Sequence, residues 1–205
     1  MQLIQTVITT NKMKNLLMAF GFMLASQLTF GQYFTITPNG FVSDKKEQFV
    51  VIEMPKEKQA VLYQNFLAGL STIYKNPKEV LSLVEGQSIT ITAYEEKVIT
   101  NKVRLVLTQI GKTTLKYDVS YTLSIQFKDG KIRINSPIFE CRRWYYDSYS
   151  QGWKTLPLVE TKGVKGSVFD KKGEIVSQES YDGLNKHFNT LIEEIIQKSK
   201  TANNW

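Results

Sequence analysis

The chain has few of the residues on which disulfide-rich, metal-binding and nucleophilic proteins depend. Its 205 residues include one cysteine, Cys141, and one histidine, His187. A single cysteine excludes an internal disulfide. No HExxH, CxxC, calcium-loop or glycine-rich phosphate motif occurs in the sequence. We therefore expect no metal and no cofactor, and no motif identifies a catalytic residue.

Two groups of side chains could still carry chemistry. Cys141 and His187 could form a nucleophile pair, but no cysteine-hydrolase signature surrounds Cys141. We expect Cys141 to be a small buried side chain in a strand and His187 to be a half-buried structural residue. Adjacent carboxylates such as Glu95-Glu96 and Glu193-Glu194 point in different directions and are expected to be solvated. The sequence favours a protein that is not an enzyme, and a hydrolase acting on envelope material is the alternative.

Acidic residues are absent from the first 31 residues, where Lys12 and Lys14 precede the apolar run "NLLMAFGFMLASQLTFG". A basic segment, a short apolar segment and small residues at its end are typical of a secretory signal peptide. We predict a signal peptide over residues 1–31, with Met13 as an alternative start and a buried N-terminal helix as the competing interpretation. The apolar run is shorter than the roughly 20 residues of a membrane span, and it contains no cysteine for lipid attachment.

These features predict an exported protein that is periplasmic, outer-surface or secreted and is not a lipoprotein. The mature chain is expected to have no transmembrane span. The full chain carries a net charge of +7, which is compatible with anionic material of the envelope or with a freely soluble protein. A hydrophobic fraction of 42% suits one globular domain, which we place at residues 32–200 with a frayed tail at 201–205.

Helices and strands are predicted from periodicity. The segment "FVVIE" (49–53) reads as a strand, and Pro55 is expected at the first position of a helix that ends before Asn76-Pro77. A second helix is expected near the C-terminus with Asp182 as its N-cap. The apolar stripes of the two helices are formed by Leu62, Phe66, Leu70 and Ile73 and by Leu184, Phe188, Leu191, Ile192 and Ile195.

Strands occupy the middle of the chain, in "VLSLVEGQSITITAY", "KVRLVLTQ" and "YDVSYTLSIQFKDGKIRI". In the last of these, apolar and polar residues alternate, and Asp129-Gly130 is a favoured two-residue hairpin loop. That loop pairs Phe127 with Ile132, Ile125 with Ile134 and Tyr121 with Ile138. Beyond Ser136-Pro137 the apolar residues change face, which predicts a bulge there.

The predicted order is strand, helix, four or so antiparallel strands, helix. It indicates an α+β two-layer sandwich, in which an antiparallel meander sheet carries two helices on one face. The polar face of the long hairpin is expected to be open.

A leader ending in "FGQ", then "FVVIEMP", "LYQNFLAGL", "GQSITITAY" and "VSYTLSIQFKDGKIRI" together resemble a family. They are similar to the secreted domain of unknown function that is common in Bacteroides and its relatives. The resemblance implies a fold like that of the TATA-box-binding protein (TBP-like) over roughly residues 41–143. It implies no activity and no functional residue.

One segment, "ECRRWYYDSYSQGW" (140–153), concentrates arginines and aromatic residues. Such side chains anchor protein interfaces, and their flat rings can also hold sugars while arginine binds a carboxylate. A glycan or a protein is therefore the predicted partner, and export argues against nucleic acid despite the TBP-like resemblance. The competing interpretation is that the rings cover the sheet edge beneath the arginines. The candidate binding residues are Arg142, Arg143, Trp144, Tyr145, Tyr146, Tyr149 and Trp153.

Overall fold

The computed structural model describes residues 31–103, 111, 113–146, 151–162 and 164–202. The chain divides into two compact units, Met1–Gly31 and Gln32–Trp205, and the fold below is that of the second. Apart from Gly31, the predicted signal peptide lies outside the described residues, as does most of the predicted strand in "KVRLVLTQ".

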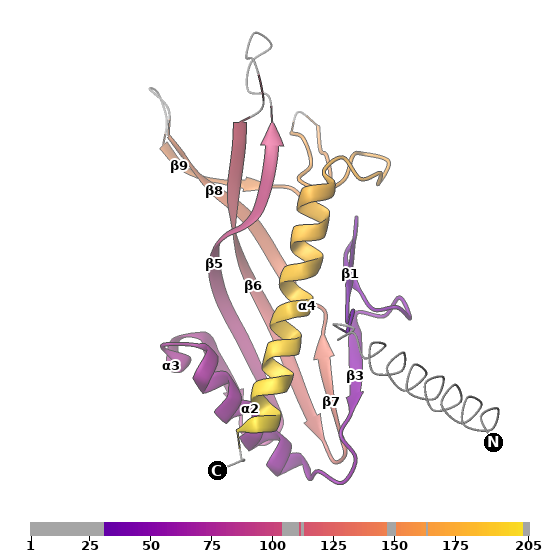
Figure 1. The fold of residues 1–205 in the computed structure, drawn as a ribbon, viewed down its shortest axis with the longest axis vertical. Coiled ribbons are helices and arrows are strands. Elements are labelled where there is room, and N and C mark those ends of the chain that lie inside the picture. Colours follow the sequence, from indigo (N-terminus) through magenta and orange to yellow (C-terminus); the bar gives the residue numbers. More distant parts are fainter. Residues whose placement is uncertain (1–30, 104–110, 112, 147–150, 163, 203–205) are drawn as a thin grey trace, which may run out of the picture. The chain divides into compact units, whose positions relative to one another are not determined.

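The main sheet is antiparallel and runs in the order β3-β7-β6-β5-β4 (Figure 1). Its strands are β3 (Phe49–Glu53), β4 (Leu81–Val84), β5 (Ser88–Val103), β6 (Thr113–Lys128) and β7 (Lys131–Asn135). From β4 to β7 each strand pairs with the next along the chain, so the predicted meander is confirmed. The strand predicted in "VLSLVEGQSITITAY" is in fact the β4–β5 hairpin, which turns at Gly86 with φ of 68°.

The predicted hairpin at Asp129-Gly130 is also confirmed. Phe127 lies opposite Ile132 and Ile125 lies opposite Ile134. The alternate residues of β6 from Tyr117 to Phe127 are buried, and those between them are at least partly exposed. One face of β6 is therefore core and the other is open.

Past the hairpin, β8 (Ile138–Tyr146) continues along the same side of β6 that β7 occupies. Here the register moves by one residue, so that Tyr121 lies opposite Phe139 and the predicted Tyr121–Ile138 pairing is wrong. The shift falls at Ser136-Pro137, where the bulge was predicted. A one-residue shift exchanges the two faces of a strand, so Cys141 is buried and Ile138 is 75% exposed.

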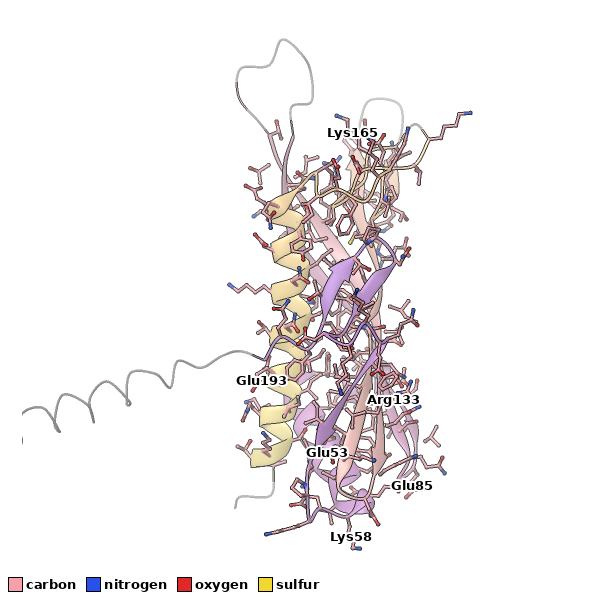
Figure 2. The ribbon with its side chains drawn as sticks, turned by 90° about the vertical axis from the view of Figure 1, so that its right-hand side faces the viewer. Glu53, Lys58, Glu85, Arg133, Lys165 and Glu193 are labelled. Atoms are coloured by element: carbon pink, nitrogen blue, oxygen red, sulfur yellow. The ribbon has the colours of Figure 1, made fainter. Side chains whose placement is uncertain are left out.

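Two helices, α2 (Gln59–Ile73) and α4 (Gln178–Thr201), cover the buried face of the sheet. The ring of Phe127 contacts Phe66 of α2, and the ring of Tyr121 contacts Phe188 of α4. Figure 2 shows these layers from the side, with Glu193 on the helix layer and Arg133 on the sheet. The predicted α+β two-layer class, with an antiparallel sheet and both helices on one face, is confirmed.

The predicted starts of both helices are wrong. Pro55 lies in a turn in which the Glu57 N–H donates to the Met54 carbonyl and Lys56 has φ of 77°, so α2 begins only at Gln59. The Gln59 N–H donates to the Asp129 carboxylate across 2.8 Å, so the β6–β7 turn caps this helix.

The C-terminal helix begins five residues earlier than predicted. Ser177, not Asp182, is the N-cap of α4, and its side chain accepts from the Ser180 N–H. The helix extends to Thr201, one residue into the predicted tail, and residues 203–205 lie outside the described part of the chain.

Other elements were not predicted. The short helix α3 (Pro77–Val80) follows α2, the strand β9 (Gln151–Leu156) follows β8, and a two-stranded sheet of β1 (Thr35–Thr37) and β2 (Gly40–Val42) precedes the main sheet. The Asn185 and Asn189 side chains of α4 accept hydrogen bonds from the backbone of residues 33–36. Within the described residues, no helix is long and apolar enough to cross a membrane.

The two helices approach each other closely at Gly69 of α2. A Cβ atom built there would lie 2.8 Å from the Ser199 backbone nitrogen of α4. We predict that Gly69→Ala lowers the free energy of unfolding by about 1–3 kcal/mol, because the helices must separate. Urea denaturation measures this change.

The matched control is Gly183 of α4, where a Cβ would lie 3.7 Å from the Val98 carbonyl oxygen, an ordinary contact. Gly183→Ala should raise the free energy of unfolding by about 0.5–1 kcal/mol, because alanine restricts the unfolded chain. Equal effects of the two substitutions would contradict the close helix contact at Gly69.

Candidate functional site

The aromatic and basic residues predicted as a binding site lie on the β8–β9 hairpin. In its register Arg142 is opposite Thr155, Arg143 is opposite Lys154, and Trp144 is opposite Trp153. Side chains alternate between the faces of a strand, and Cys141 is buried on the face that carries the helices. Arg142, Trp144, Tyr146 and Trp153 therefore lie on the open face, and Arg143 and Tyr145 lie on the other. Tyr149 lies outside the described residues.

The open-face residues form a connected cluster. The Arg142 guanidinium carbon lies 5.0 Å from the ring centre of Tyr94 and 4.8 Å from that of Trp153. Trp144 meets Trp153 edge to face, with ring centres 5.5 Å apart at 80°. We call Tyr94, Arg142, Trp144, Tyr146 and Trp153 the open aromatic face.

These rings are unusually exposed. Tyr94 is 40% exposed, Trp153 47%, Trp144 51% and Tyr146 76%. Of the predicted rings, Trp144, Tyr146 and Trp153 are thus exposed, whereas Tyr145 is half-buried. The predicted position of an arginine over the rings is observed for Arg142, which lies over two of them. Such cation–π contacts contribute about 0.5–2 kcal/mol each.

Arg143 belongs to a different cluster. Its guanidinium carbon lies 5.7 Å from the ring centre of Tyr117 and 5.8 Å from that of Tyr145. The Lys154 ammonium lies 3.6 Å from the ring centre of the same Tyr145. Arg142 and Arg143 therefore lie on opposite sides of β8, because neighbours in a strand alternate, and they are not placed to bind one carboxylate together.

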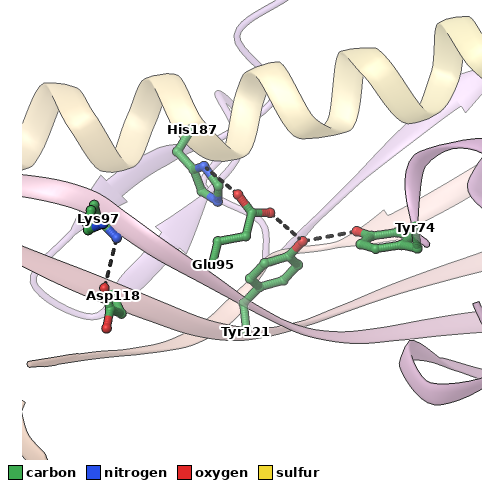
Figure 3. Close-up of polar contacts among 6 residues, drawn as sticks. All are labelled: Tyr74, Glu95, Lys97, Asp118, Tyr121 and His187. Carbon is green, nitrogen blue, oxygen red and sulfur yellow. Dashed lines mark hydrogen bonds and ion pairs between the residues drawn. The ribbon is translucent and has the colours of Figure 1, made fainter. Parts of the chain in front are cut away.

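Tyr94 and the carboxylate that positions it were not among the predicted site residues. The Tyr94 hydroxyl donates to Asp118 Oδ2 across 2.6 Å, and this hydrogen bond raises the pKa of Tyr94 to about 12. The Lys97 N–H donates to Asp118 Oδ1 across 2.8 Å (Figure 3). Lys97 has φ of 59° and lies in a β-bulge between Glu95 and Ile99. In the sequence, the only indication of this bulge is that the alternation of apolar and polar residues in β5 ends at Glu95-Glu96.

Glu95 precedes this bulge and, by the alternation of β5, faces the helix layer, where a second cluster forms. The Tyr121 hydroxyl donates to Glu95 Oε1 across 3.0 Å and lies 3.0 Å from the Tyr74 hydroxyl. His187 Nδ1 of α4 lies 3.7 Å from Glu95 Oε2 (Figure 3). Glu96, in contrast, lies beside the Lys97 ammonium at 3.7 Å. As predicted, the two neighbouring carboxylates point in different directions, and the Glu95 side chain is 40% exposed.

His187 and Cys141 do not show the properties of a nucleophile pair. Burial raises the pKa of Cys141 to about 12, so the thiol stays protonated near neutral pH. Burial lowers the pKa of His187, and the charge of Glu95 opposes this change. His187 Nε2 is buried without a hydrogen-bond partner. The prediction of a buried structural cysteine is confirmed.

Metal binding finds no support in the part of the chain that the structure describes. There, no three histidine, cysteine, aspartate or glutamate side chains come together to hold a metal ion.

Comparison with known proteins identifies likenesses of fold. No family model and no curated protein matches the chain. Among solved structures, it is similar to a TBP-like protein from Parabacteroides distasonis, with 12% identity, a TM-score of 0.47, and coverage of 76% of this chain and 92% of that one. It is also similar to a DUF4468 family protein from Bacteroides ovatus, with 10% identity, a TM-score of 0.44, and coverage of 75% and 83%. These names coincide with the family that the sequence resembles, and neither specifies an activity or a ligand.

The buried imidazole predicts a pH dependence of stability. The pKa of His187 lies below 6.5 in the folded protein and near 6.5 in the unfolded chain, so unfolding takes up a proton in this range. The free energy of unfolding should therefore fall as the pH is lowered from about 7.5 to about 5.5. Because His187 is the single histidine, His187→Gln should remove much of this slope. Urea denaturation at several pH values measures it, and identical slopes for the two proteins would contradict the assignment.

Proposed function

We propose that the chain is an exported, non-catalytic binding domain of the cell envelope and that its open aromatic face binds a protein partner. The observation that carries this proposal is the exposure of four aromatic rings on the sheet face opposite the helices, two of which lie against Arg142. Tryptophan, tyrosine and arginine supply most of the binding energy in protein interfaces. Ile138, on the same face and 75% exposed, extends the apolar surface.

The arrangement of the rings favours a protein over a glycan. Trp144 and Trp153 stand at 80° to one another, and Tyr94 and Trp153 at 82°. Rings at such angles do not form one flat platform for a sugar chain, whereas their edges and faces suit packing against the side chains of a protein. Arg142 is already held by two rings, so less conformational entropy is lost when it binds.

Location outside the cytoplasm is supported by Lys12, Lys14 and the apolar run that follows them. Nucleic acid is not proposed as a partner, because an exported domain rarely meets it. The alternative of a hydrolase acting on envelope material gains nothing from Cys141, whose thiol is buried and protonated.

Photo-crosslinking in cells tests the proposal. The open-face Tyr146 and, in a second strain, the opposite-face Tyr145 are each replaced by p-benzoylphenylalanine. We expect a discrete protein adduct from position 146 and none from position 145, because the two side chains lie on opposite sides of β8. Trp144→Ala added to the position-146 strain should abolish the adduct and change the free energy of unfolding by less than about 1 kcal/mol.

The matched positions separate the alternatives. Equal labelling from both positions, or no adduct from either, would contradict the proposed surface. An adduct at position 146 that glycosidases remove would instead identify a glycan as the ligand.

A further inference from the structure

A cavity of about 710 Å³ lies beside the bulge of β5, between the end of α2 and the first half of α4. Its volume falls within the range of roughly 300–1,000 Å³ that is typical of small-molecule sites. The apolar side chains that line it include Ile73, Val80, Val98 and Leu191. Its polar lining includes Tyr74, Glu95 and His187, so the cavity combines apolar walls with a few convergent polar groups.

The carboxylate of Glu95 is fixed in this cavity by its neighbours. Its Oε1 atom accepts from the Tyr121 hydroxyl, which is itself in contact with the Tyr74 hydroxyl at 3.0 Å. Its Oε2 atom lies 3.7 Å from His187 Nδ1, beyond the usual length of a hydrogen bond. Oε2 therefore keeps capacity to accept from a bound molecule.

No positive charge of the described residues balances this carboxylate. Burial lowers the pKa of His187, so the imidazole is neutral near pH 7. The neighbouring Lys97 ammonium lies beside Glu96 instead. Lys186 lines the rim of the cavity, and among the described side chains no lysine or arginine lies within 4.0 Å of the Glu95 carboxylate.

The surroundings of Glu95 add further negative potential. Burial raises the pKa of Tyr74, its hydrogen bond with Tyr121 opposes this, and the charges of Glu95 and Glu194 add to the increase. Both carboxylates line the cavity. A cation would therefore be attracted to the end of the cavity where the Tyr74 ring and the Glu95 carboxylate meet.

We propose that this cavity binds a small molecule carrying a primary alkylammonium group, with the ammonium at Glu95 and the alkyl body against Ile73, Val80 and Leu191. The ammonium has three donors and no acceptor. Glu95 Oε2, whose neighbour His187 Nδ1 lies 3.7 Å away, is the acceptor for one of these donors. This site lies on the helix side of the sheet and does not depend on a partner at the open aromatic face.

Calorimetric titration of the mature chain with three six-carbon probes tests this proposal. Hexylammonium should bind at least about tenfold more tightly than 1-hexanol, because a hydrogen bond to a charged group is worth about 1.5–3 kcal/mol. Hexanoate should bind most weakly, since its charge repels Glu95. Equal affinities for hexylammonium and 1-hexanol, or no binding of hexylammonium, would overturn the proposal.

Adjacent carboxylates provide a matched pair of variants. Glu95→Gln preserves shape and removes the charge, and it should abolish the preference for hexylammonium over 1-hexanol. Glu96→Gln removes the same charge one residue along the strand and should leave that preference intact. If both variants lose this preference equally, the general charge of the protein, rather than the cavity, attracts the probe. That result would contradict the proposed site.

A third variant keeps the test decisive if Glu95→Gln does not fold. Val80→Trp fills the apolar wall on α3 without altering the Tyr74–Tyr121–Glu95 contacts. It should weaken hexylammonium binding at least about tenfold, because the alkyl body loses its place. Unchanged binding in Val80→Trp would place the probe elsewhere and refute the proposed site.

Discussion

Both candidate sites depend on the β-bulge of β5, and the carboxylate of Asp118 stabilises this bulge. It lies on β6 opposite the place where β5 bulges, and it accepts from the Lys97 N–H and the Tyr94 hydroxyl. Lys97 has φ of 59°, in a left-handed conformation that costs a non-glycine residue about 1–2 kcal/mol. A charged acceptor for the Lys97 N–H offsets this cost, since hydrogen bonds to ionised groups are stronger than neutral ones.

Two consecutive residues of β5 just before the bulge lie in the two different candidate sites. Tyr94 lies on the open face, where Arg142 and Trp153 contact its ring, and Glu95 lies under α4 beside His187. An uninterrupted strand would also alternate these side chains. The bulge adds a local bend and twist, and beyond it Ile99 returns to the core opposite Tyr117. An open aromatic surface and a pocket on the helix side thereby share one short segment of the sheet.

Much of the fold could be predicted because it follows from local alternation. The β6–β7 hairpin needs only a two-residue turn and matching apolar faces, and the change of face after Ser136-Pro137 is visible as Phe139 and Cys141. The helix starts could not be predicted, because Asp129 caps α2 from a hairpin 70 residues away and Pro55 serves a turn instead. Local propensity does not contain such tertiary contacts.

The candidate site was only partly accessible to the same reasoning. Once Cys141 is placed inward, alternation alone separates Arg142 from Arg143, so the sequence contained that answer. Tyr94 and Asp118 could not be linked to Arg142, because their contacts depend on which strands lie beside β6. Glu95 and His187 meet only because α4 packs over the bulge, and no spacing in the sequence encodes that contact.

Because the two sites share one segment of the sheet, only some substitutions affect one site without affecting the other. Asp118 contacts neither the Glu95 carboxylate nor an exposed ring other than Tyr94, yet its loss would release the Lys97 backbone and so move both Tyr94 and Glu95. A defect in a variant of Asp118 therefore cannot be assigned to one surface. Residues on other elements, such as Trp144 of β8 and Tyr74 at the end of α2, each belong to one site alone. Substitutions that test one site separately must therefore be made at such residues, because a substitution next to the bulge affects both sites.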